Sequence, residues 1–206
     1  KVSIAGDGLK PDVCALDPSL LTSLPSSVVA DAGLDAACQA MESLWSVQST
    51  PESEQMAWAA LHLSVENLHK AVNSADDDSL AAMLVAAHLA GKAINLTTTT
   101  APHALSYGLT SLLGIPHGRA VALLFGAIFD RTADRSADAR GHPKGAAFVR
   151  KRLEKIAQCW GQTCECFPDW WAAYLRGPLN LPSLYSNTTP PPMDTLAASV
   201  NAKRLA

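Results

Sequence analysis

Two histidines, each directly after a proline, are the residues best placed to do chemistry in this sequence of 206 residues. His103 and His117 stand fourteen positions apart. On one continuous helix they would lie about 21 Å apart, too far for both to bind one metal ion at about 2.1 Å. The intervening Gly114-Ile115-Pro116 breaks a helix and lets the chain fold back. The spacing therefore predicts two successive helix starts that can aim both imidazole rings into one cavity.

An earlier stretch offers two more ligands. Asp35 and Gln39 are four residues apart, so they share one face of a helix. Their neighbours are alanine, leucine, cysteine and methionine, and an ionised carboxylate in such apolar surroundings needs a partner. A divalent cation would serve, which predicts a four-residue metal site made of Asp35, Gln39, His103 and His117. The alternative is an aspartate in the first turn of a helix and two hydrogen-bonded core histidines.

Helical patterns follow one another through most of the chain. Start and stop signals predict helices over residues 26–45, 51–73, 81–96, 100–114, 116–129, 145–160 and 167–175, with an exposed loop at 130–144. A proline-rich linker at 187–192 leads to a last short helix that ends at residue 206. We therefore predict a mostly α fold, a helical bundle formed by residues 18–206.

The first 17 residues have a different pattern. Two short apolar runs, at residues 2–4 and 13–16, are separated by a turn and are typical of an edge-type β segment. Two isolated strands cannot bury a face by themselves. We therefore expect residues 1–17 to be a short β remnant of a sheet-bearing domain that precedes Lys1 and is missing here.

Composition excludes several classes of protein. Apolar residues make up 48% of the chain and charged residues 17%, a balance typical of a packed globular body. The net charge is −3 and the sequence has no basic stripe, which argues against a nucleic-acid partner. No uninterrupted apolar run approaches the roughly 20 residues that span a bilayer, so we expect no membrane partner. The five scattered cysteines are an odd number and suit reduced thiols, and we expect a cytoplasmic protein.

Four motifs together resemble the helical domain of the iron-containing (group III) alcohol dehydrogenases. They are Asp35-x-x-x-Gln39, Ala86-Ala87-His88-Leu89-Ala90-Gly91, Pro102-His103-Ala104-Leu105-Ser106-Tyr107 and Gly114-Ile115-Pro116-His117-Gly118. The phosphonoacetaldehyde reductase-like branch is the most similar, through residues 42–47 and 99–103. The resemblance implies a dehydroquinate synthase-like C-terminal domain, and it makes residues 1–17 the remnant of an α/β nucleotide-binding domain.

The resemblance also implies a chemistry. Asp35, His103 and His117 match family ligands of Fe²⁺ or Zn²⁺, whereas Gln39 stands where most relatives have a histidine. An amide oxygen binds these ions more weakly than imidazole, so Gln39 is expected to be a weak fourth ligand; the alternative is a branch that needs less metal. The implied reaction is hydride transfer between NAD or NADP and a small aldehyde or alcohol, with phosphonoacetaldehyde as one candidate. The full-length form is expected to be a homodimer.

Six further residues, and the threonines at 97–100, receive roles from the resemblance or from their place beside the metal. Tyr107 replaces a histidine common in relatives, and its hydroxyl could donate to the substrate or belong to a core tyrosine. Lys92 and Asn95, with the threonines at 97–100, would suit an anionic substrate group; alternatively Lys92 extends to solvent and Thr100 only caps a helix. Arg119 could add a contact to that group or lie on the surface. Lys1 and Leu21 match positions that contact the nicotinamide cofactor.

Two other functions remain open at this point. A metal-dependent lyase of the dehydroquinate synthase kind shares the broad architecture. A non-catalytic module with a decayed site is suggested by Gln39. No strand–Gly-x-Gly-x-x-Gly–helix pattern is present in the sequence, so we expect the 206-residue chain alone to be poorly active.

Overall fold

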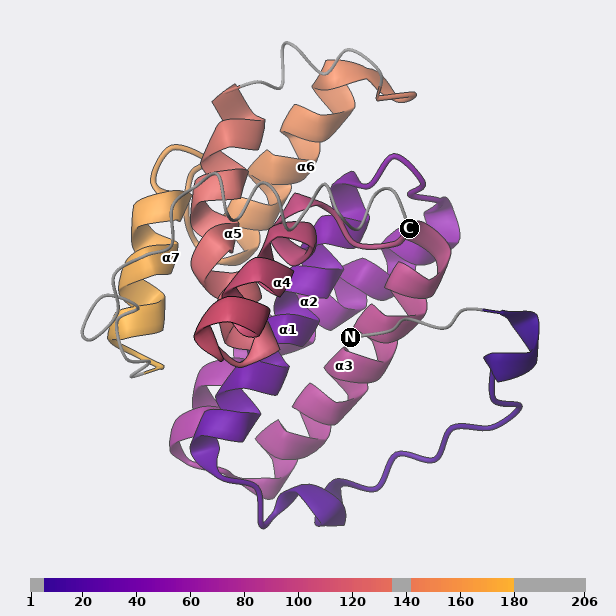
Figure 1. Cartoon of the computed structure of the whole chain (residues 1–206), viewed down its shortest axis with the longest axis vertical. Helices are drawn as coiled ribbons and strands as arrows, with labels where there is room; N and C mark the ends of the chain where they lie inside the picture. Colours follow the sequence, from indigo (N-terminus) through magenta and orange to yellow (C-terminus); the bar gives the residue numbers. More distant parts are fainter. Residues whose placement is uncertain (1–5, 135–141, 180–206) are drawn as a thin grey trace.

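A computed structural model of the chain describes residues 6–134 and 142–179. Within these ranges it is almost entirely helical (Figure 1), which confirms the mostly α fold class. The elements are two 3₁₀ helices, η1 (Asp7–Leu9) and η2 (Pro18–Leu21), and the α-helices α1 (Ser26–Trp45), α2 (Pro51–Asn73), α3 (Asp77–Thr97), α4 (Ala101–Leu113), α5 (His117–Asp134), α6 (Gly145–Cys159) and α7 (Phe167–Arg176).

Local capping explains why the predicted helix starts agree with the structure. Thr50, directly before Pro51, and Ser53, two residues after it, form a reciprocal capping box at the start of α2. Asp76 accepts the backbone N–H of Ser79 at 2.9 Å and so caps α3. These hydrogen bonds join residues only three positions apart, and so they can be read from the sequence.

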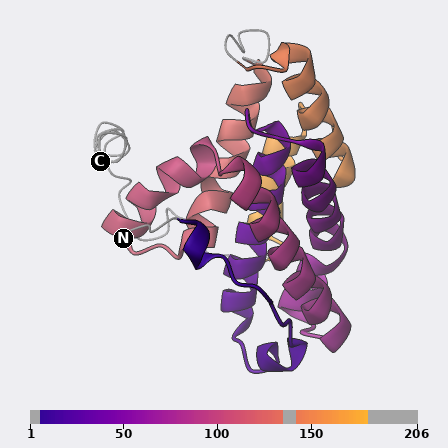
Figure 2. The same cartoon turned by 90° about the vertical axis from the view of Figure 1, so that its right-hand side faces the viewer.

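Helix α1 is the centre of the bundle, because α2, α3 and α5 all pack on it (Figures 1 and 2). Its many alanines and Gly33 let these neighbours approach closely: a Cβ at Gly33 would lie 2.4 Å from Leu68 Cδ1 of α2. Helix α3 is long and apolar enough to cross a membrane by length and composition alone. In the structure it packs against α1 and α2 as a helix of the bundle.

Aromatic side chains hold α5 against α7. Phe129 of α5 lies 4.4 Å from Phe167 between ring centroids, and Phe125 lies 5.5 Å from Trp171. The indole N–H of Trp171 donates to the carbonyl of Ala122 at 2.8 Å, so this buried polar atom is satisfied. Helix α5 is thereby fixed on one side by α7 and on the other by α1.

Two sequence predictions need correction. Residues 13–16 form no strand in the described part of the chain; they run along the outside of the bundle, and Val13 is 82% exposed (Figure 1). A strand needs a neighbouring strand to receive its backbone hydrogen bonds, and nothing described here provides one. The loop predicted at 130–144 begins later, because α5 continues to Asp134 through residues that contain no helix breaker. Residues 2–4, the linker at 187–192 and the final helix lie outside the described ranges.

Candidate metal centre

A tight turn brings His103 and His117 together. Helix α4 ends at Gly114, which has the left-handed φ of 68° that glycine adopts without strain, and α5 begins at His117. The three residues between the helices return the chain alongside α4. The two imidazole ring centroids are therefore 5.4 Å apart, whereas on one continuous helix the two residues would be separated by about 21 Å. The predicted fold-back is confirmed.

Asp35 of α1 completes a group of three potential metal ligands. Its Oδ1 lies 3.1 Å from His103 Nε2 and 3.8 Å from His117 Nε2. One ligand atom from each of the three residues lies within 4.8 Å of the others. His103 is buried, whereas Asp35 and His117 are partly exposed, so the group opens to solvent on one side. A carboxylate oxygen and two imidazole nitrogens are a donor set that zinc and ferrous iron accept, and these residues fit such an ion.

The residue after His117 explains how α5 comes so close to α1. A Cβ at Gly118 would lie 1.9 Å from the carbonyl oxygen of Asp31 and 3.0 Å from Asp35 Cβ. Only glycine leaves room for this approach, which sets His117 beside Asp35. The sequence contained this signal, a glycine directly after the Pro-His pair, but its spatial reason depends on a helix more than 80 residues earlier.

Each histidine is held through its other ring nitrogen. His103 Nδ1 lies 2.5 Å from Oε1 of Glu42, and His117 Nδ1 lies 3.3 Å from the hydroxyl oxygen of Ser106. The single hydroxyl proton of Ser106 is donated to the carbonyl of His103 at 2.8 Å, so its oxygen accepts from His117. Both rings therefore turn Nε2 toward Asp35, the arrangement in which hydrogen-bonded imidazoles bind metals.

Glu42 and Ser106 were not singled out from the sequence. One available signal was position: Glu42 stands seven residues after Asp35, on the same face of α1. It also follows Ala40 and Met41 and precedes Leu44, an apolar setting in which a carboxylate needs partners. Ser106 carried no comparable signal.

The surroundings of His103 favour its protonated, charged form. Burial lowers its pKa, but hydrogen bonds to Asp35 and Glu42 and their negative charges outweigh burial and raise the pKa to about 9. A proton here takes the place that a cation would fill between the same groups.

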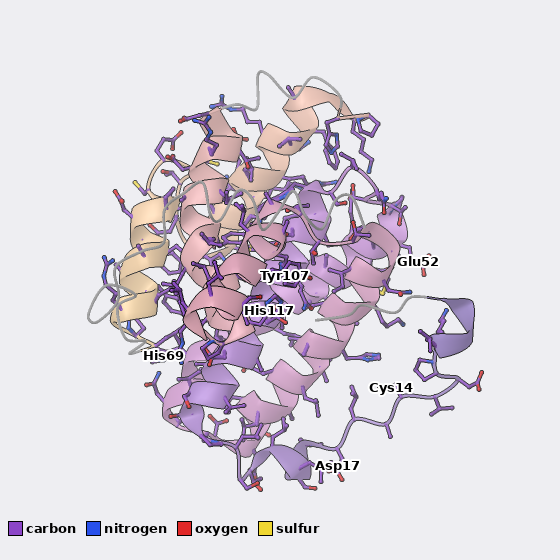
Figure 3. The ribbon with its side chains drawn as sticks, viewed as in Figure 1. Cys14, Asp17, Glu52, His69, Tyr107 and His117 are labelled. Atoms are coloured by element: carbon purple, nitrogen blue, oxygen red, sulfur yellow. The ribbon has the colours of Figure 1, made fainter. Side chains whose placement is uncertain are left out.

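Gln39 and Tyr107 both lie beside the three ligands. The Gln39 side-chain N–H donates to Asp35 Oδ2 at 2.8 Å, so this amide holds the carboxylate oxygen that faces away from the histidines. That Gln39 binds a metal through its amide oxygen stays a prediction. The ring of Tyr107 stacks on His117, with centroids 5.6 Å apart and planes at 13° (Figure 3).

The residues expected to bind an anionic substrate group are placed differently. Lys92 and Asn95 are exposed on α3, and their substrate role stays a prediction. The hydroxyls of Thr97 and Thr100 face α1 and bond Ser43 and Glu42, so they are not part of a lining open to an anion.

Arg119 is already paired within the protein. It forms a two-point ion pair with Asp31, at 2.9 and 3.2 Å, and its side chain is 15% exposed. Leu21 is half-buried at the end of η2 and packs on the core, and Lys1 lies outside the described residues. Their cofactor roles stay predictions.

This helical chain, with its group of three potential metal ligands, is placed in one family by comparison with known proteins. Residues 29–169 match the C-terminal domain of the Fe-containing alcohol dehydrogenase family, to which the chain therefore belongs. Phosphonoacetaldehyde reductase of Streptomyces viridochromogenes is 36% identical over 164 residues, which cover 79% of this chain and 42% of the reductase.

Two solved structures have the same fold. An iron-containing alcohol dehydrogenase from Thermococcus thioreducens has a TM-score of 0.79 and 25% identity, covering 95% of this chain and 48% of that one. Sulfoacetaldehyde reductase from Bifidobacterium kashiwanohense, in complex with NAD⁺, has a TM-score of 0.77 and 28% identity, covering 96% and 50%. The chain thus spans about half the length of the relatives it matches.

Proposed function

We propose that this chain is the metal-binding half of an oxidoreductase that transfers a hydride between a nicotinamide cofactor and a small aldehyde or alcohol. The observation that carries the proposal is the convergence of Asp35, His103 and His117 in a chain of this family. Fe²⁺ or Zn²⁺ bound there would act as a Lewis acid toward the substrate oxygen. We propose that NAD or NADP carries the hydride; the sulfoacetaldehyde reductase named above is in complex with NAD⁺.

The side chains of the protein would position the cation and the substrate, and would neutralise part of the cation's charge. With a cation bound, both imidazoles would be neutral and Asp35 would contribute the negative charge of the three-residue group; the exposed side of the group leaves room for a substrate. The Tyr107 ring, stacked on His117, places its hydroxyl within the same region, and we propose that it donates a hydrogen bond to the substrate oxygen. Gln39 is proposed as a weak fourth ligand.

The names of two relatives support a proposal for the substrate class. The proteins named above include reductases of phosphonoacetaldehyde and of sulfoacetaldehyde, small aldehydes with an anionic group. We propose a substrate of this kind for the complete enzyme, which we expect to be a cytoplasmic homodimer with no nucleic-acid or membrane partner. Lys92 and Asn95, exposed on α3, are the candidates for contact with the anionic group.

Metal analysis tests the proposal directly. The purified chain should hold close to one equivalent of iron or zinc after dialysis, and Asp35→Ala should lose it. The matched control is Glu66→Ala, which removes an exposed carboxylate of α2 and should keep the metal. If the wild type holds no metal after dialysis, or if Asp35→Ala binds metal as tightly as the wild type, the proposed metal centre is wrong. With the centre established, the full-length enzyme should oxidise NADH or NADPH when given phosphonoacetaldehyde.

A further inference from the structure

Glu42 is a fully buried carboxylate with every contact directed at the metal centre or its support. It lies on α1, has 0% exposure, and uses both oxygens. Oε1 is bonded to His103 Nδ1 at 2.5 Å. Oε2 accepts the backbone N–H of Thr100 at 2.5 Å and the Thr100 hydroxyl at 2.7 Å. An ionised group this deep persists only when it is hydrogen-bonded as fully as this.

The Thr100 contact fixes where α4 begins. Thr100 is the N-cap residue of α4, yet its own side chain makes no capping hydrogen bond. In a capping box the N-cap N–H is usually satisfied by a side chain three residues later, and that position is His103 here. Glu42 takes over this task from another helix. Glu42 therefore holds both the backbone N–H of the N-cap residue of α4 and the ring that projects from the first turn of that helix.

The His103 contact fixes which nitrogen faces the ligand group. A carboxylate only accepts hydrogen bonds, so the proton on His103 Nδ1 points to Glu42. In the neutral ring Nε2 then carries the lone pair, and Nε2 is the atom 3.1 Å from Asp35. Carboxylate–histidine pairs of this form orient metal-binding imidazoles in other proteins.

We propose that Glu42 is the positioning residue of this metal centre: it selects the His103 tautomer that presents Nε2 and holds that ring at the start of α4. The inference rests on the proposed function, because it concerns how the same three ligands are prepared for a cation. A purely structural cap would support α4 without affecting the choice of nitrogen.

The variant Glu42→Gln separates these two roles. Glutamine keeps the volume and can accept the fixed Thr100 N–H through its single oxygen. Its NH₂ group then faces His103 Nδ1, which must accept, so the proton moves to Nε2 and blocks the metal-binding atom. We expect Zn²⁺ affinity, measured by competition with a chromophoric chelator, to fall 10- to 100-fold.

Ser43→Ala is the matched control. Ser43 is the neighbouring residue on α1, is equally buried, and bonds the Thr97 hydroxyl at 2.9 Å, so it supports the turn between α3 and α4 without contact to His103. Its Zn²⁺ affinity should stay within about threefold of wild type. If Ser43→Ala loses as much affinity as Glu42→Gln, Glu42 is only part of a structural network and the inference is wrong.

A spectroscopic measurement decides the question even if Glu42→Gln does not fold. ¹⁵N NMR of the Zn²⁺-loaded wild-type chain should show His103 protonated at Nδ1 and bound through Nε2. Binding through Nδ1 would overturn the positioning role, as would an unchanged affinity in folded Glu42→Gln. If the wild-type chain binds no Zn²⁺, Fe²⁺ or Co²⁺ at all, the proposed function fails first, and the inference fails with it.

Discussion

The variant Gly118→Ala would test whether close packing of α5 on α1 is what assembles the ligand group. A Cβ at this position would lie 1.9 Å from the carbonyl oxygen of Asp31, whereas ordinary contact begins at 3.4 Å. The start of α5 would have to move by about 1.5 Å, because the obstacle is helix backbone and cannot rotate away. His117 Nε2, already 3.8 Å from Asp35 Oδ1, would move with it.

The displacement sets the size of the expected loss of Zn²⁺ affinity in Gly118→Ala. Metal ligands tolerate displacements of about 0.2 Å, so a shift of this size removes His117 from the group. We expect Zn²⁺ affinity to fall at least 100-fold, more than is typical when an outer hydrogen bond is lost. Overpacking costs about 1–3 kcal/mol of folding free energy, partly offset by the roughly 1 kcal/mol advantage of alanine over glycine in a helix.

The assay combines chelator competition with thermal unfolding of the metal-free proteins. Gly91→Ala is the matched control, since a Cβ at this glycine of α3 would meet nothing within 4 Å. It should keep the wild-type affinity and raise the unfolding temperature slightly. If Gly118→Ala retains both wild-type affinity and wild-type stability, the close approach is not what positions His117.

Three further predictions follow from the same group. Gln39→His should raise Zn²⁺ affinity at least about tenfold, because imidazole is the better ligand for zinc beside Asp35. In the metal-free chain, the folded-state pKa of His103 is about 9, above its ordinary value of 6.5. The protonated ring therefore stabilises the fold fully below about pH 6.5, and this contribution is lost as the pH rises through about 9. The urea midpoint of unfolding should fall over that pH range. Tyr107→Phe keeps the ring stacked on His117, and in the full-length enzyme it should lower kcat/KM roughly 3- to 10-fold with metal affinity unchanged.

Each of the three has a result that contradicts it. An unchanged affinity in Gln39→His would mean that the side chain at this position does not reach the metal. The control His103→Gln has no titrating ring, and its urea midpoint should stay constant from pH 6 to about 9.5. The same constant midpoint in the wild type would show that protonated His103 does not stabilise the fold. Full activity in Tyr107→Phe would leave the tyrosine as a packing residue.

Much of the helical architecture could be predicted from short-range signals. Thr50, Asp76 and Gly114 end or begin helices through bonds and backbone angles that involve only residues a few positions away. The Pro-His pairs on either side of Gly114 marked two candidate ligands in the same way, and the apolar surroundings of Asp35 marked a third. The strand predicted at residues 13–16 is not formed, because its apolar run has no neighbouring strand to pair with among the described residues.

Only the tertiary structure decided how the ligands are held and which polar groups are already occupied. Glu42 reaches His103 across 61 positions of sequence, and Arg119 reaches Asp31 across 88. Gly118 matters because of a carbonyl on another helix. Contacts of this kind leave no periodic pattern, because they depend on how helices are packed rather than on the local preference of any residue. Sequence therefore determined which side chains could bind a metal, and packing determined which atoms of those side chains face one another.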